Sequence, residues 1–74
     1  MVQNNDILKK FGERVKNLRI EKGINSQMKL SFMAKLDRTY IGGIERGERN
    51  PSLKNLQKIA EAFGVELSEL FRFK

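Results

Sequence analysis

Glycines and a single proline divide the 74-residue chain into short segments, and this punctuation limits the folds that it can adopt. The breaks fall at Gly12, Gly23, Gly42, Gly43, Gly47, Pro51 and Gly64. Between them, apolar residues recur at helical spacings, and no alternating run is long enough to predict a strand. A chain of this length has room for only one core, so the sequence predicts a single all-α domain over residues 1–74.

The first two predicted helices are bounded by capping residues. The first is expected between a cap at Asn5 or Asp6 and a closing Gly23. Its apolar face comprises Ile7, Leu8, Phe11, Val15 and Leu18. The second runs from its N-cap at Ser26 to about Ala34. Its inner face is expected to comprise Leu30, Met33 and Ala34.

Three further helices follow. The third begins after Asp37, a good N-cap, and ends near Gly47. The fourth follows Asn-Pro-Ser at 50–52 and ends at Gly64. Its apolar stripe comprises Leu53, Leu56, Ile59, Ala60 and Phe63. A short helix over about 67–71 completes a predicted five-helix domain.

The second and third helices are separated by only a few residues and together span about 27–46. A helix-turn-helix needs an early apolar residue, a small residue where the helices cross, and apolar residues in its second helix. Leu30, Ser31, Ala34, Leu36, Ile41 and Ile44 supply this pattern. The spacing therefore predicts a helix-turn-helix at helices two and three.

Composition excludes several kinds of chemistry and favours one kind of partner. With no Cys and no His, the chain can form no disulfide, no thiolate or imidazole metal site and no Ser-His or Cys-His nucleophile. Glu45 and Glu48 lack a paired acid, so the chain is predicted not to be an enzyme and to need no cofactor. The 15 Lys and Arg against 9 Asp and Glu give a net charge of +6, which favours polyanionic partners. Because apolar runs are short, no membrane association is expected, and the predicted location is cytoplasmic.

The stretch 36–47, Leu-Asp-Arg-Thr-Tyr-Ile-Gly-Gly-Ile-Glu-Arg-Gly, resembles the Xre/Cro-type helix-turn-helix regulators. Within that family, the chain is similar to the controller proteins of restriction-modification systems. Supporting matches are Leu18-Arg19, Ser26-Gln27, 50–53 and 64–71. The resemblance implies a phage-repressor-like DNA-binding domain. The chain departs from the family in a longer turn, with Asn25 or Ser26 as the extra residue. It also has Lys35 where Gly is usual, which implies strain if its φ is positive.

The resemblance implies which residues read DNA sequence. Arg38, Thr39 and Tyr40 fall in the first turn of the third helix, which enters the major groove in helix-turn-helix complexes. Arg can bond guanine O6 and N7, and Thr offers a hydroxyl and a methyl group to base edges. The alternatives are a surface ion pair of Arg38 with Asp37 or Glu48, and an ordinary core-edge position for Tyr40.

Gly42 and Gly43 stand together inside the third helix, where each Gly costs about 0.8–1.0 kcal/mol relative to Ala. One interpretation is that the missing side chains let the backbone approach DNA or let long neighbours reach past it. The other is close packing against a second helix. We favour the first, and predict Gly43 as a base contact.

Phosphate contacts are expected on both sides of the third helix. Arg46, Arg49 and Lys54 lie in and after the loop that follows it, where members of the family contact the DNA backbone. Gln27 and the N–H groups at the start of the second helix should meet another phosphate, and Lys29 adds to the same field. The alternatives are a solvated basic loop and, for Gln27, simple polarity at a helix cap.

Two further sets of residues are expected to support the fold and its assembly. In the family, residues matching Arg19 and Glu45 form a partly buried ion pair that ties the first helix to the third. The C-terminal region carries more large apolar side chains than a lone small domain hides, which predicts a dimer interface. Its candidate residues are Phe63, Val65, Leu67, Leu70 and Phe71. The alternative is that all of them belong to the monomer core.

The sequence thus predicts a homodimeric transcriptional regulator that binds a palindromic operator in double-stranded DNA, with one or two dimers per site. By resemblance it would control restriction-modification genes, and no small-molecule effector is expected. One alternative is an antitoxin or phage-type repressor of another operon. A second, of a different class, is a protein-interaction module that uses the apolar C-terminal face.

Overall fold

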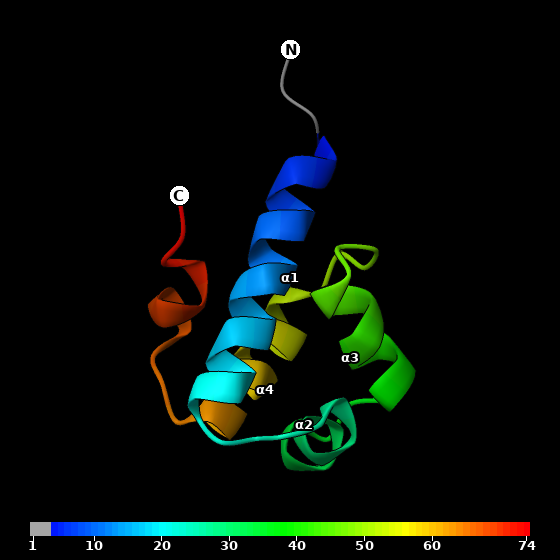
Figure 1. Ribbon diagram of the computed structural model, residues 1–74, viewed down its shortest axis with the longest axis vertical. Coiled ribbons are helices and arrows are strands. Elements are labelled where there is room, and N and C mark those ends of the chain that lie inside the picture. The colour runs from blue at the N-terminus through cyan, green and yellow to red at the C-terminus, as the bar shows by residue number, and fades with distance from the viewer. Residues whose placement is uncertain (1–3) are drawn as a thin grey trace.

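The computed structural model describes residues 4–74, and the regular secondary structure in that range is all helical, which confirms the predicted fold class (Figure 1). Its elements are α1 (Asn4–Glu21), α2 (Gln27–Ala34), α3 (Arg38–Glu45), α4 (Leu53–Phe63) and η1 (Leu67–Phe71). The last element is a 3₁₀-helix, so the five predicted helices are four α-helices and one tighter turn. Within residues 4–74, no helix combines the length and apolarity that crossing a bilayer requires.

Side-chain caps begin three of the helices. Ser26 Oγ accepts a hydrogen bond from the Lys29 N–H at 3.0 Å, and the Asp37 carboxylate accepts one from the Thr39 N–H at 3.0 Å. Ser52 caps α4 in the same way. The predicted cap of the first helix is wrong, because α1 already begins at Asn4 and positions 5 and 6 lie inside it.

In the turn between α2 and α3, the condition for strain at Lys35, a positive φ, is met. Lys35 adopts φ 58° and ψ 43°, the left-handed region, and is the one non-glycine residue with positive φ among those described. The Leu36 N–H then bonds the Ser31 carbonyl at 3.0 Å, which closes α2. Ser31 is buried, so its small side chain lies inside the helix-turn-helix, where a close crossing needs one.

The core draws on α1, α2, α3, α4 and η1 together. Its buried apolar residues are Phe11, Val15, Leu18, Ile24, Leu30, Ala34, Ile41, Ile44, Leu56, Ile59, Ala60, Phe63 and Leu70. The predicted inward positions of Ile7, Met33 and Leu53 are wrong, since these side chains are 54%, 45% and 69% exposed. Ile7 and Leu53 lie near the starts of their helices, and in α2 the buried stripe runs through Ser31 instead of Met33.

Helix α1 crosses α3 at a point where there is no space for a side chain. A Cβ atom at Gly12 would collide with the main-chain oxygen of Ile44 and lie 2.7 Å from that of Glu45. Gly12 is therefore required for the close contact between the two helices. In Figure 1, α3 and η1 lie on opposite sides of α1, so the fold presents two separate surfaces.

Candidate nucleic-acid interface

The outward face of α3 is a stripe formed by residues at positions i, i+3, i+4 and i+7. These residues are Thr39, Gly42, Gly43 and the C-cap residue Arg46. Ile41 and Ile44, on the opposite face, are 0% and 1% exposed and anchor α3 in the core. The fold thus fixes which face of α3 points outward, and places two glycines at its centre.

Long side chains from neighbouring positions cover both glycines. A Cβ atom at Gly43 would lie 2.5 Å from Cγ of Arg49, and one at Gly42 would lie 3.1 Å from both Arg46 Nη1 and Gln27 Oε1. The atoms nearest the two glycines therefore belong to polar and charged side chains. This agrees with the interpretation that long neighbouring side chains reach past the glycines, and not with close packing against a second helix. Gly43 is buried, and the Arg49 side chain lies over it.

Tyr40 links the loop after α3 to the helix itself. The guanidinium carbon of Arg49 lies 5.7 Å from the centre of the Tyr40 ring, within cation–π range. The Tyr40 hydroxyl accepts a hydrogen bond from Asn55 Nδ2 at 3.1 Å. Tyr40 is half-buried, so it borders the core and also carries Arg49 on its ring.

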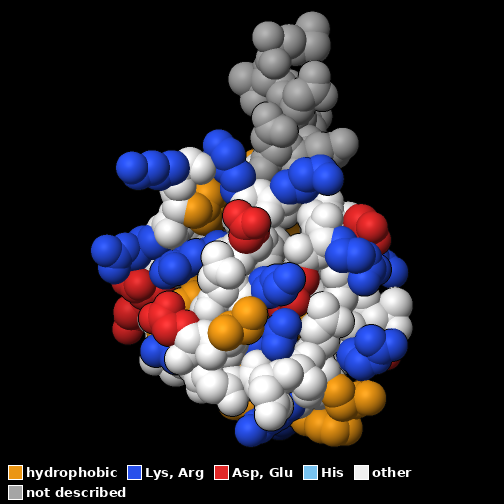
Figure 2. Space-filling view, in the orientation of Figure 1, with side chains coloured by type: hydrophobic (Ala, Val, Ile, Leu, Met, Phe, Trp, Pro, Cys, Tyr) orange, Lys and Arg blue, Asp and Glu red, His pale blue; other side chains and the backbone are white. Residues whose placement is uncertain are grey.

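The remaining predicted contact residues are free to meet a ligand. Arg38, Thr39, Lys29 and Lys54 are all exposed. Glu48, one suggested partner of Arg38, instead pairs with Arg46 at 3.1 Å. Figure 2 shows Lys and Arg side chains on the right of the view, where Figure 1 places α3 and the loop after it, and also on the left, where Figure 1 places η1.

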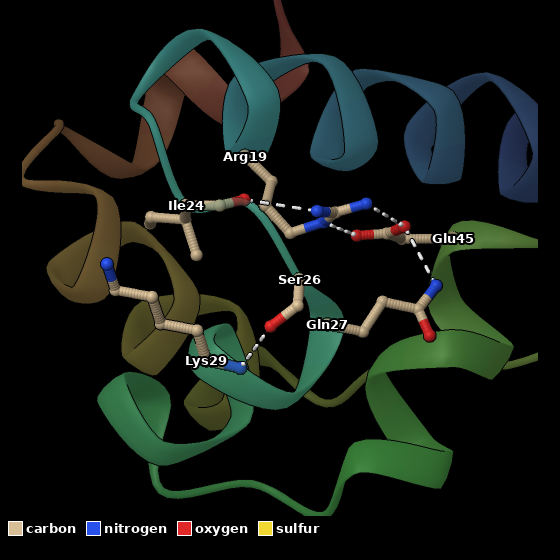
Figure 3. Close-up of polar contacts among 6 residues, drawn as sticks. All are labelled: Arg19, Ile24, Ser26, Gln27, Lys29 and Glu45. Atoms are coloured by element: carbon tan, nitrogen blue, oxygen red, sulfur yellow. Dashed lines mark hydrogen bonds and ion pairs between the residues drawn. The ribbon is translucent and has the colours of Figure 1, made fainter.

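The pair that the family resemblance implied is present beneath this surface (Figure 3). Arg19 Nε lies 2.7 Å from Glu45 Oε2, and the two side chains are only 9% and 3% exposed. Arg19 Nη1 also donates to the Ile24 carbonyl at 3.1 Å, which fixes the turn before α2. The pair therefore joins α1, this turn and α3 with charge-assisted bonds.

Glu45 also orients Gln27, at the start of α2. Gln27 Nε2 donates to Glu45 Oε1 at 3.0 Å (Figure 3). A carboxylate can only accept, so the amide nitrogen must face it, and the Gln27 carbonyl oxygen is turned away. Gln27 is thus connected to the buried ion pair at one end and to the α3 surface at the other.

The C-terminal apolar set divides into buried and exposed members. Phe63 and Leu70 are 5% and 0% exposed within the single chain, so they belong to its core and offer no surface to a partner. Val65 and Leu67 are half-buried against the same core. Phe71 is 46% exposed, and its ring stacks on Phe11 with centroids 5.4 Å apart. Of the five predicted interface residues, Phe71 has the most exposed side chain.

Sequence reasoning missed two residues that shape this region. Asn55 holds the Tyr40 hydroxyl from α4, and Gly12 permits the contact between α1 and α3. A glycine that interrupts the apolar face of an otherwise good helix was a usable signal for close approach of another backbone. No comparable signal connects Asn55 with Tyr40, which is fifteen positions away in the chain.

Comparison with known proteins agrees with this geometry. The helix-turn-helix family model HTH_3 matches residues 15–70. The control protein C.BamHI of Bacillus amyloliquefaciens is 48% identical over 69 residues, which cover 93% of this chain and 85% of the relative. The control protein C.MunI of a Mycoplasma species is 51% identical over 67 residues, which cover 90% of each protein.

A solved structure extends the likeness to three dimensions. The crystal structure of the restriction-modification controller protein C.AhdI from Aeromonas hydrophila matches with a TM-score of 0.83 and 53% sequence identity. The match covers 86% of this chain and 96% of that one. The chain belongs to the Xre-type helix-turn-helix family of DNA-binding transcription regulators, which are not enzymes, and it is similar to the controller proteins of restriction-modification systems.

Proposed function

We propose that the chain is a homodimeric regulator that binds a palindromic operator and controls the genes of a restriction-modification system in the cytoplasm. The observation that carries the DNA-binding part is the outer face of α3, where Thr39 is exposed and Arg46 and Arg49 lie over two glycines. A buried ion pair holds the helix in place. The relatives named as control or controller proteins support the biological role, at 48%, 51% and 53% identity.

In this proposal, α3 enters the major groove with Arg38 and Thr39 at base edges. Both side chains are exposed in the first turn of α3, the part of a recognition helix that contacts bases. Tyr40, also in the first turn, borders this base contact and positions Arg49, whose guanidinium lies over the Tyr40 ring. Phosphate contacts lie on either side: at the start of α2 from Lys29 and from the second N–H of the Gln27 amide, and after α3 from Arg46, Arg49 and Lys54.

We assign the dimer interface to the apolar surface beside η1. A groove there is lined by Ile7, Leu8, Phe11, Asn50, Pro51, Leu56, Phe71 and Phe73. Phe71 belongs to both the groove and the predicted interface, and a second copy of the chain is the proposed occupant. A twofold pair would place two recognition helices about 34 Å apart, in successive major grooves on one side of the duplex.

Selection of bound sites from random duplex DNA, followed by sedimentation of the complex, tests this proposal. We expect an enriched site with two symmetric half-sites and a complex that contains two chains, or four if two dimers bind side by side. Recovery of no preferred sequence would refute operator binding. A single unsymmetric site bound by one chain would refute the dimer.

A phage-type repressor is the second candidate, supported by one further relative. The immunity repressor of Bacillus phage phi105 is 39% identical over 59 residues, a stretch that covers 80% of this chain and 40% of that protein. The two candidates share their DNA chemistry. They differ in the promoter that is bound, so the selected operator would be sought beside restriction-modification genes.

A further inference from the structure

The central positions of the α3 stripe carry no side chain, although they belong to the helix that is proposed to meet DNA. Gly is among the least favourable residues in a helix interior, so two adjacent glycines need a compensating role. Both have negative φ, and therefore neither is required by a left-handed backbone. Their role must come from what lies above them.

Arg49 runs across the helix at Gly43. Three successive atoms of its side chain, Cγ, Cδ and Nε, would lie 2.5, 3.5 and 3.3 Å from a Cβ atom at this position. Beyond this crossing, the guanidinium group rests on the Tyr40 ring. The absence of a side chain at Gly43 therefore leaves room for Arg49, from the loop after α3, to reach Tyr40 in the first turn of the helix.

Gly42 provides a similar space for two other side chains. Gln27 Oε1 and Arg46 Nη1 would each lie 3.1 Å from a Cβ atom there. The Gln27 amide nitrogen donates a hydrogen bond to Glu45, so the amide carbonyl oxygen points the other way, over Gly42. The polar groups above the middle of α3 thus come from α2, from the end of α3 and from the loop after it.

We propose that Gly42 and Gly43 are positioning residues for operator recognition: they hold Gln27, Arg46 and Arg49 across α3 and make no base contact themselves. This inference rests on the proposed DNA-binding function. At Gly43, a methyl group would collide with Cγ of Arg49, so this exposed side chain must turn away near its base and leave its place over α3. Residue 43 would thereby alter operator affinity, through the position of Arg49, while the domain stays folded.

A double-mutant cycle between Gly43→Ala and Arg49→Ala tests the proposal on an operator selected by the unaltered chain. Gly43→Ala should weaken operator binding by about tenfold, comparable to the loss of one arginine contact. In the Arg49→Ala background, the same glycine substitution should change affinity by less than about twofold, because the displaced side chain is absent. The thermal midpoint of Gly43→Ala should change little, because the higher helix propensity of Ala offsets the cost of turning the Arg49 side chain.

Parallel variants separate the two glycines and the effect of charge. Gly42→Ala should lose affinity in the unaltered chain and much less in a Gln27→Ala, Arg46→Ala background. Lys10→Ala removes one positive charge from an exposed site beside Arg72, on the η1 side of α1, and serves as the control. It should change operator affinity by less than about twofold.

Three results would overturn the proposal: unchanged binding by Gly43→Ala, an equal loss with and without Arg49, or a clear fall in the thermal midpoint. The last would show that the glycine serves folding. Failure of the unaltered chain to select any operator would instead remove the proposed function, so the two failures are distinguishable.

Discussion

Removing Arg19 should destabilise the domain more than any surface substitution, because it strands a buried carboxylate. The Arg19 and Glu45 side chains are 9% and 3% exposed, and Arg19 Nε lies 2.7 Å from Glu45 Oε2. Without Arg19, the Glu45 carboxylate would keep Gln27 as its remaining side-chain donor. Breaking such a pair costs about 3–5 kcal/mol, and the slight exposure of Arg19 favours the lower end. A domain of 74 residues typically has a free energy of unfolding of about 4–11 kcal/mol, so Arg19→Met should remove a large fraction of it.

Urea unfolding followed by circular dichroism measures this loss. With a slope of about 1 kcal/mol/M, the midpoint of Arg19→Met should fall by about 3 M. The double variant Arg19→Met, Glu45→Leu should recover at least half of the loss, because no unpaired charge then remains buried. Glu48→Gln breaks an ion pair whose side chains are 57% and 62% exposed, and should change stability by less than about 1 kcal/mol. If Arg19→Met were as mild as Glu48→Gln, the reasoning from burial would be refuted.

Other substitutions test the remaining parts of the account. Arg38→Ala should weaken binding to a selected operator by about 1–3 kcal/mol and relax preference at one base position, which repeated site selection would reveal; an equal loss on random DNA would contradict base reading. Lys54→Ala should weaken all sequences alike and reduce the slope of log affinity against log salt by about 0.9, whereas a change confined to one operator would assign Lys54 to base readout. Phe71→Ser should shift the sedimenting species from dimer to monomer, and an unchanged dimer would place the interface elsewhere. Ser26→Ala should lower the free energy of unfolding by about 1 kcal/mol through loss of the α2 cap; no change in the urea midpoint would show that the cap contributes nothing.

Much of the fold follows from local rules that act over a few residues. Ser26 and Asp37 are short side chains that satisfy the first N–H groups of a helix, and both cap as predicted. Lys35, where the family has Gly, adopts the left-handed conformation that glycine adopts without strain. The helix-turn-helix pattern was readable for the same reason, because its residues lie within one short stretch of sequence.

The errors arise where burial depends on partners distant in the sequence. Leu53 continues the apolar pattern of α4, yet it is 69% exposed because no other element covers the start of that helix. Met33 was expected inside, but the crossing of α2 with α3 selects Ser31. Periodicity identifies a helix face, whereas only the tertiary arrangement decides how far along that face the core extends.

For the candidate site, residue types were readable and their mutual arrangement was not. The adjacent glycines Gly42 and Gly43 were recognisable as costly and hence informative. Which side chains lie over them depends on the path of the loop after α3, and Arg49 crosses Gly43 because that loop turns back along the helix. Asn55 reaches Tyr40 across the same turn of the chain, a contact that no local pattern contains.

Methylation interference at guanine N7 on a selected operator tests the insertion of α3 most directly. N7 lies in the major groove, so methylation of a contacted guanine blocks binding there. We expect interference at two symmetric clusters whose centres are about 10 base pairs apart, one for each α3 of a dimer. Interference at a single cluster, or binding indifferent to N7 methylation throughout the site, would contradict the insertion of paired helices into successive major grooves.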